Sequence, residues 1–265
     1  MAGMSKKENV ENQYSDKQNL SVRLNFHKKY STNPVSYQDW LFEFYPIFEG
    51  CRILELGCGT GVLWDGKIDK LPKGTSLILS DYSQGMVDVV MEKFSSNKNI
   101  SFQQIDIQEI PFEAAYFDLV IANSMLYHVP DISKALLEVQ RVLKPSGTFI
   151  CATTGENGMN HWMHHTLKKF NPKISAFYEG RIPFTMQNGS TILEKYFDKV
   201  EDFQYDNATK VTETNDLIEY IRSTISISGI TEKQIEGLDQ FFEEIRQSQG
   251  AIEIPVDAGT FVSKK

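Results

Sequence analysis

The stretch ILELGCGTG, residues 53–61, decides the fold class of this 265-residue chain. An apolar, strand-like run ends in three glycines at alternate positions, Gly57, Gly59 and Gly61. Glycine lets the backbone approach a ligand where a Cβ atom would collide with it. A plain strand-to-helix turn needs one or two glycines, so the third favours a ligand-binding loop. Two nucleotide motifs do not fit: Val62 stands where a Gly-x-Gly-x-x-Gly fingerprint needs its last glycine, and the Gly-Lys-Ser/Thr ending of an ATP P-loop is missing.

Strand-like and helical segments alternate around this stretch. Residues 132–143 carry apolar side chains every three or four positions behind Asp131, a suitable N-cap, and are predicted to be a helix. Repeated alternation predicts an α/β fold, a doubly wound and mostly parallel sheet with helices on both faces. The segments that we predict to be strands are 52–56, 76–80, 100–105, 117–122, 147–153, 199–205 and 259–263.

The predicted organisation has four parts. They are a tail and packing helix at 1–48, a ligand-binding core at 49–153, a lid insertion at 154–188, and a C-terminal part of the core at 189–265 with a helical insertion at about 206–256. Both insertions follow strands that we expect to be parallel, so both leave the sheet at the carboxyl ends of its strands, where ligands bind in such folds. We therefore expect them to cover the site as lids.

Outside the ligand-binding core, the sequence predicts a tail and four helices. The polar residues 1–20 are expected to be a mobile tail, and residues 154–188 lack the regular spacing of a core helix. The expected helices are one through Leu41, Phe44, Tyr45 and Phe48, one at 191–197, one at 215–225, and one at 231–248 that Thr231 and Gln234 open as a capping box.

Two aspartates follow predicted strands. Asp81 ends the second strand, twenty positions beyond Gly61, where a carboxylate can accept hydrogen bonds from both hydroxyls of a ribose. The alternative is that Asp81 caps the helix that begins near Gln84. Asp106 ends the third strand and is followed by Ile107, so the pair could bind the amine and the ring face of an adenine.

Together these stretches resemble the class I S-adenosylmethionine-dependent methyltransferases, most closely the branch of ubiquinone and menaquinone biosynthesis enzymes. The motifs that carry the resemblance are ILELGCGTG at 53–61, LSDYS at 79–83, IDIQEIPF at 105–112, FDLVIANSMLYHV at 117–129 and RVLKPSGTF at 141–149. The resemblance implies a Rossmann-like, seven-stranded sheet whose last strand is antiparallel. It also implies S-adenosyl-L-methionine as the cofactor, with S-adenosyl-L-homocysteine as the product.

The resemblance also implies which residues bind the cofactor. Residues Glu55, Gly57, Gly59 and Gly61 would surround its methionine end, Asp81 would hold the ribose, and Asp106 with Ile107 the adenine. The full set of expected cofactor-binding residues is Glu55, Gly57, Cys58, Gly59, Thr60, Gly61, Asp81, Tyr82, Met86, Asp106, Ile107, Asn123 and Ser124.

A general base is needed only if the acceptor must lose a proton. His128 follows the fourth predicted strand and is the best candidate, because the pKa of histidine suits proton transfer near neutral pH. It could equally pack over the cofactor or cap the next helix. Tyr127 is the weaker candidate.

Histidines and aromatic residues downstream leave alternatives open. His161, His164 and His165 have helical spacing, but no carboxylate or cysteine joins them at ligand spacing, so we expect no metal site. The aromatic residues in 26–45 and 162–184 form either core packing or an apolar pocket for the acceptor.

Composition narrows the choice of acceptor. With 27 basic and 35 acidic residues the net charge is −8, which disfavours a nucleic acid as substrate. We therefore expect a small-molecule acceptor, apolar or aromatic, methylated on nitrogen, oxygen or carbon. The alternatives are a nucleic-acid or protein methyltransferase and a non-catalytic subunit that binds the cofactor for a partner.

The sequence also indicates the cellular compartment and the state of the cysteines. No apolar run is long enough to cross a bilayer and the polar start is not a secretory signal, so we expect a cytoplasmic protein. The three cysteines, Cys51, Cys58 and Cys151, are expected to be buried without forming a disulfide.

Overall fold

The computed structural model describes residues 17–177 and 182–265, so most of the expected tail lies outside the described residues. The chain divides into two compact units. The sheet unit consists of residues 37–154, 183–204 and 258–265. The helical unit consists of the described residues of 1–36, 155–182 and 205–257.

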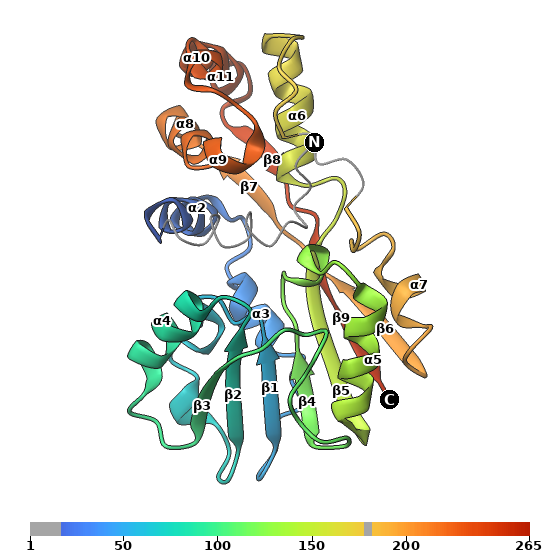
Figure 1. The fold of residues 1–265 in the computed structure, drawn as a ribbon. Coiled ribbons are helices and arrows are strands. Elements are labelled where there is room, and N and C mark those ends of the chain that lie inside the picture. Colours follow the sequence, from blue (N-terminus) through green and yellow to red (C-terminus); the bar gives the residue numbers. More distant parts are fainter. Residues whose placement is uncertain (1–16, 178–181) are drawn as a thin grey trace. The chain divides into compact units, whose positions relative to one another are not determined.

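The sheet unit is built on seven strands in the order β3-β2-β1-β4-β5-β9-β6 (Figure 1). The neighbours β3, β2, β1, β4 and β5 are parallel, and β9 is antiparallel to both β5 and β6. This confirms the predicted seven-stranded sheet and its antiparallel last strand. The strands are β1 (Arg52–Leu56), β2 (Ser76–Asp81), β3 (Ile100–Gln104), β4 (Phe117–Ile121), β5 (Leu143–Thr154), β6 (Lys199–Gln204) and β9 (Ala258–Lys264).

The strand order reverses direction between β1 and β4. The chain runs outward from β1 through β2 to β3, then returns to pair β4 with the other edge of β1. Such a switch point opens a crevice at the carboxyl ends of the strands, where ligands of doubly wound sheets bind. The glycine loop follows β1 directly, so it lies at this switch point.

Successive residues of β1 supply cores on both faces of the sheet. Ile53 packs in one cluster with residues of α4 (Gln84–Phe94), and Leu54 packs in the other with residues of α5 (Ile132–Val142). Because side chains alternate across a strand, a continuous apolar run is needed where helices cover both faces. Burial of each such side chain stabilises the fold by about 1.5–3 kcal/mol.

The first helix of the sheet unit corrects a prediction. The helix expected through Leu41, Phe44, Tyr45 and Phe48 is instead α3 (Tyr37–Phe42), and Phe48 is 52% exposed. Pro46 explains the early end, because the residue before a proline avoids helical backbone angles. Similarly, the helix expected at 191–197 is the shorter α7 (Gly189–Leu193).

The helical unit has its own core and contains six helices within the described residues. They are α2 (Lys17–Tyr30), α6 (Met159–Phe170), α8 (Thr214–Arg222), α9 (Ile225–Ser228), α10 (Glu232–Ile235) and α11 (Leu238–Gln249). The unit also holds a two-stranded sheet of β7 (Ala208–Val211) and β8 (Ile252–Pro255), which sequence reasoning missed. None of the described helices is long and apolar enough to span a membrane.

Two expectations for the helical unit are wrong. Residues 154–188 do contain a core helix, α6, which buries Met163 and Leu167 one turn apart. The helix expected at 231–248 is broken at Gly237, whose φ of +82° cannot continue a right-handed helix. The capping box of Thr231 and Gln234 is confirmed at the start of α10.

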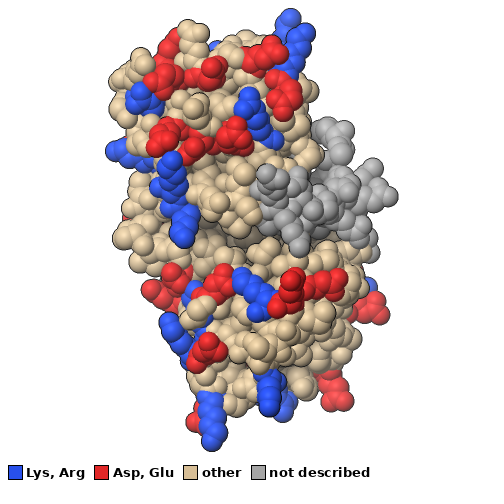
Figure 2. Space-filling model, turned by 90° about the vertical axis from the view of Figure 1, so that its left-hand side faces the viewer, with Lys and Arg blue, Asp and Glu red and all other residues tan. Residues whose placement is uncertain are grey.

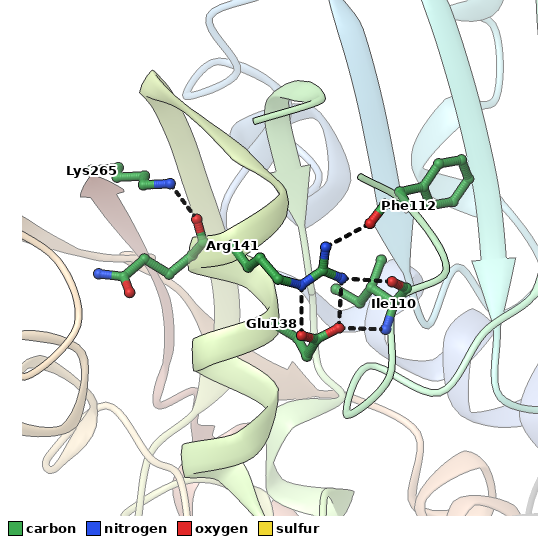
Figure 3. A network of polar contacts seen from close by, with 6 residues as sticks. Ile110, Phe112, Glu138, Arg141 and Lys265 are labelled. Carbon is green, nitrogen blue, oxygen red and sulfur yellow. Dashed lines mark hydrogen bonds and ion pairs between the residues drawn. The ribbon is translucent and has the colours of Figure 1, made fainter. Parts of the chain in front are cut away.

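A polar network fastens the loop after β3 to α5 (Figure 3). Arg141 donates to both carboxylate oxygens of Glu138 and to the carbonyls of Ile110 and Phe112, while Glu138 accepts the Ile110 N–H at 2.9 Å. Lys265 donates to the carbonyls of Gln140 and Leu143 near the end of α5. The network holds the segment that follows Asp106, one of the expected site residues.

Replacing Arg141 should therefore weaken the sheet unit. Arg141→Met leaves the Glu138 carboxylate and two carbonyls without their donor, so we expect the free energy of unfolding in urea to fall by about 1–3 kcal/mol. The matched control is Arg222→Met, which removes an exposed pair with Glu219 at the same i, i+3 spacing and should cost less than about 1 kcal/mol. Equal losses in the two variants would contradict the role of the network.

Candidate functional site

The three glycines of the loop have different reasons to be glycine. All have positive φ: +73° at Gly57, +55° at Gly59 and +69° at Gly61. A Cβ at Gly57 would lie 2.9 Å from Met125, and one at Gly61 would lie 2.7 Å from Phe94. A Cβ at Gly59 would meet no protein atom within 4 Å. Protein packing therefore accounts for the outer two glycines, whereas Gly59 faces open space that a ligand can use.

Asp81 ties this loop to the turn after β2. Its Oδ2 accepts the Gly59 N–H at 3.0 Å and its Oδ1 accepts the Ser83 N–H at 2.9 Å. Ser83, and not Asp81, is the N-cap residue of α4, which weakens the alternative interpretation of Asp81 as a helix cap. Burial raises the pKa of the Asp81 carboxyl, and the backbone donors oppose that shift. Asp81 thus holds a half-buried carboxylate beside Gly59.

Glu55 is a second buried carboxylate, one residue before the end of β1. Its side chain is 3% exposed, and the indole N–H of the fully buried Trp64 donates to Oε2 at 2.6 Å. The pKa of Glu55 is raised to about 7. Burial is the main cause and the charge of Asp81 adds to it, whereas the hydrogen bond from Trp64 lowers the pKa. Trp64 was not identified from the sequence, because a lone tryptophan in an apolar turn is usually core packing.

The other expected residues of these two segments differ in their surroundings. Cys58 is buried, and burial with the charges of Glu55 and Asp81 raises the pKa of its thiol. Thr60 is half-buried, with its carbonyl accepting from Lys93 at 3.3 Å. Tyr82 is half-buried and lies before α4, and Met86 is buried in the first turn of α4.

Asp106 forms a local turn after β3. Its Oδ1 accepts the backbone N–H of Gln108 at 2.9 Å and the side-chain amide of the same residue at 3.0 Å. Ile107 is buried in the core on the α5 side of the sheet, so its packing role is clear from the structure alone. The carboxylate of Asp106 is half-buried and could accept further donors.

Asn123 joins three segments beyond β4. Its Oδ1 accepts the Ala152 N–H at 3.1 Å, and its amide donates to the hydroxyl of Tyr45 at 2.7 Å. Tyr45 is buried, and burial together with the charge of Glu55 holds the pKa of its hydroxyl well above the usual value. Sequence reasoning assigned Tyr45 only to helix packing, but its hydroxyl contacts the candidate site residue Asn123.

Ser124 has left-handed backbone angles, with φ of +54°, and its N–H donates to the Ala152 carbonyl at 2.8 Å. A non-glycine residue in this region is strained, and such strain often accompanies functional sites. Ser124 therefore remains a good candidate for the ligand crevice.

His128 and Tyr127 lie in a 3₁₀ turn (Leu126–His128) that follows β4. Their rings meet edge to face with centroids 4.5 Å apart, and both side chains are half-buried. The turn belongs to the carboxyl side of the sheet, so the sequence-based placement of both residues is reasonable for a proton-transfer role.

The other histidines and most aromatic residues have structural surroundings. His161 and His165 pack ring to ring at 4.3 Å on α6, and His164 Nδ1 lies 2.9 Å from the carbonyl of Ala176. Among the described residues, no three His, Cys, Asp or Glu side chains are grouped to hold a metal. Phe26 and Phe184 are buried in the cores of their units, which is the packing interpretation. The three cysteines are buried and free, as expected.

The site as a whole fits a cationic nucleoside ligand. S-adenosylmethionine carries an ammonium and a sulfonium group, which suit the buried Glu55 carboxylate and the half-buried Asp81 carboxylate, both held by neutral N–H donors. The open space at Gly59 suits close contact between backbone and ligand.

Comparison with known proteins supports the same ligand. Residues 54–151 match the family model described as a methyltransferase domain. Demethylmenaquinone methyltransferase of Staphylococcus aureus is 32% identical over 156 residues, which cover 56% of this chain and 64% of the relative. The chain thus spans less than two thirds of the length of the curated relatives it matches.

Solved structures show the same fold. A putative methyltransferase from Bacillus halodurans superposes with a TM-score of 0.59 at 14% identity, covering 86% of this chain and 98% of the other. The YcgJ protein of Bacillus subtilis superposes with a TM-score of 0.57 at 16% identity, covering 86% and 97%. These likenesses establish the fold, and residues 54–151 match a methyltransferase domain.

The raised pKa of Glu55 gives a pH-dependent stability. The folded state keeps this proton up to about pH 7, whereas the unfolded chain releases it near its ordinary pKa of 4.5. The folded state therefore binds more protons in that window, and the free energy of unfolding falls as pH rises through it. Glu55→Gln removes this cost, so urea unfolding should show the variant gaining about 1 kcal/mol over wild type at pH 5.5 and about 3 kcal/mol at pH 8. A gain that did not increase with pH would contradict the assigned pKa.

The open space at Gly59 predicts a selective loss of ligand binding. Gly59→Val puts a branched side chain into that space, so affinity for S-adenosylmethionine measured by calorimetry should fall by about 100-fold or more. The control is Gly50→Val, at the other end of β1, where φ is +77° and a Cβ also meets nothing within 4 Å. Both variants should lose about 1–3 kcal/mol of stability from backbone strain, but Gly50→Val should bind normally. Normal binding by folded Gly59→Val would refute the loop assignment.

Proposed function

Since residues 54–151 are a methyltransferase domain of the class I, S-adenosylmethionine-dependent type, we propose that the chain is an enzyme that methylates a small apolar molecule. The observation that carries the proposal is the pair of carboxylates, the buried Glu55 and the half-buried Asp81, beside the open space at Gly59. These features suit the binding of the cofactor, and the acceptor follows from separate arguments.

The apolar acceptor is supported by the relative and by the surface charge. The similar protein of Staphylococcus aureus acts, by its name, on demethylmenaquinone, an apolar quinone. The face drawn in Figure 2 carries lysines and arginines interspersed with acidic residues, and not gathered into one basic area. Together with the net charge of −8, this distribution favours a small molecule over a nucleic acid.

The helical unit is the proposed source of acceptor contacts. The chain leaves the sheet for this unit after Thr154 and after Gln204, and returns at Ala258. Because β9 is antiparallel and Thr154 pairs with Ala258, the connections at Thr154, Gln204 and Ala258 are at the carboxyl edge of the parallel strands. Ligands of such sheets bind at that edge, which supports a role of residues 155–182 and 205–257 in binding the acceptor.

The chemistry asks little of the protein beyond placement. Bound S-adenosylmethionine supplies a methyl group that its positive sulfur has already activated for in-line displacement. The glycine loop and Asp81 hold the ligand in one orientation, which brings donor and acceptor together. Where the acceptor carries a proton that must leave, His128 is the proposed base, with Tyr127 beside it.

Replacing His128 tests both the activity and the base. Transfer of a labelled methyl group from S-adenosylmethionine to a panel of quinones, phenols and amines should identify an acceptor. With that acceptor, His128→Ala should lower kcat by about 100-fold, because general-base catalysis typically contributes this much. Affinity for the cofactor should change little, and the control Tyr127→Phe should keep most of the activity.

Each contrary outcome points to a different error. An unchanged kcat in His128→Ala would leave His128 a packing residue. Transfer only to protein or nucleic acid would refute the small-molecule acceptor. Cofactor binding without transfer to any substrate class would support the non-catalytic subunit instead.

A further inference from the structure

We propose that Trp64 is a positioning residue of the cofactor site, whose indole N–H holds the Glu55 carboxylate as the counter-charge for the cationic end of S-adenosylmethionine. The inference rests on the proposed function and deepens it. It concerns a tryptophan outside the glycine motif, which acts through Glu55 and not by contact with the ligand.

The contact joins two fully enclosed side chains. Trp64 is 0% exposed and Glu55 3% exposed, and Nε1 lies 2.6 Å from Oε2. An indole N–H can only donate, so it stabilises the ionised carboxylate more than the protonated acid. Within the described part of the chain, Oε1 has no hydrogen-bond partner, which leaves that oxygen for a ligand.

The local fold explains how Trp64 reaches back to β1. Gly61, with φ of +69°, turns the chain into a 3₁₀ turn (Val62–Trp64), and the Trp64 N–H donates to the Gly61 carbonyl at 3.0 Å. Phe42 packs edge to face on the indole at 5.8 Å. The backbone bond and the ring contact hold the indole, and its N–H donates to the Glu55 carboxylate.

The groups around Glu55 make a donor necessary. Asp81 approaches from the end of β2, Cys58 from the glycine loop, and Tyr45 from the segment before β1. Burial and the charge of Asp81 both raise the pKa of Glu55, to about 7, whereas Trp64 lowers it. Without the indole, the carboxyl would hold its proton at higher pH and would no longer offer a full charge to a cation.

A purely structural Trp64 would behave differently. The indole would then fill the core, and Glu55 would serve only as an acceptor for its N–H. Replacing Trp64 would loosen the loop and weaken ligand binding by the same factor at every pH. A positioning role shifts the pH dependence, because it acts on the ionisation of Glu55.

The test measures binding of S-adenosylmethionine and S-adenosylhomocysteine by calorimetry from pH 6 to pH 9. In wild type, affinity corrected for the ionisation of the ligand's own α-amino group, which loses its proton at about pH 8, should rise with pH and level off above the pKa of Glu55. Trp64→Phe, which keeps most of the ring, should bind about tenfold more weakly at pH 7, with its midpoint about one pH unit higher and affinity recovering by pH 9. Glu55→Gln should bind weakly with no midpoint in this range, and adding Trp64→Phe to it should cause little further loss.

A readout without ligand covers the case in which Trp64→Phe does not fold. In wild type, the indole N–H resonance of Trp64 should shift with pH, with a midpoint near 7, and Glu55→Gln should abolish that titration. Trp40→Phe and Trp162→Phe assign the other two indole signals.

The outcomes separate this inference from the proposed function. A pH-independent loss in Trp64→Phe, or an indole resonance that titrates equally in Glu55→Gln, would overturn the role of Trp64 while leaving the methyltransferase activity standing. Failure of wild type to bind either ligand at any pH would overturn the proposed function, whatever the indole signal shows.

Discussion

Two carboxylates, the buried Glu55 and the half-buried Asp81, lie near the carboxyl ends of the neighbouring strands β1 and β2. Burying a carboxylate costs several kcal/mol unless hydrogen-bond donors replace the lost water. The donors here are neutral: the backbone N–H groups of Gly59 and Ser83 for Asp81, and the indole of Trp64 for Glu55. Neutral donors stabilise the charge without cancelling it, so the site remains negative and suits a cationic ligand.

The supply of these donors depends on the path of the loop. Gly59 can point its N–H at Asp81 because the chain passes through three left-handed residues, at Gly57, Gly59 and Gly61. Packing keeps it there, since Met125 closes against Gly57 and Phe94 of α4 closes against Gly61. Packing in the sheet unit thus holds the glycine loop in place, and the loop in turn holds the Asp81 carboxylate through the Gly59 N–H.

Much of the sheet unit could be predicted because its signals are local. The strands are continuous apolar runs, and the glycine pattern marks the end of β1 within nine residues. Errors arose where a distant or opposing effect decided the outcome. Pro46 stopped the helix that the spacing of Leu41 and Tyr45 suggested. The pairing of β7 with β8 joins short segments about forty residues apart, which no local pattern signals.

Side-chain partnerships were harder to predict than backbone elements. Glu55 was expected in the site, but its donor Trp64 lies nine residues on and looks like any buried aromatic residue in the sequence. The same holds for Tyr45, whose hydroxyl meets Asn123 across 78 positions of sequence. Such contacts depend on which side chains a turn brings face to face, and sequence periodicity carries no information about that.

The matched family segment covers part of the sheet unit and none of the helical unit. Backbone groups of one contiguous loop, with acids at strand ends, are the proposed cofactor-binding groups, and the matched family segment 54–151 lies wholly within the sheet unit. The helical unit is assembled from three separate segments with a core of their own, and none of them falls within that match. Cofactor chemistry therefore follows from the family. The acceptor contacts that we propose for the helical unit lie outside the matched segment, so the match does not identify the acceptor.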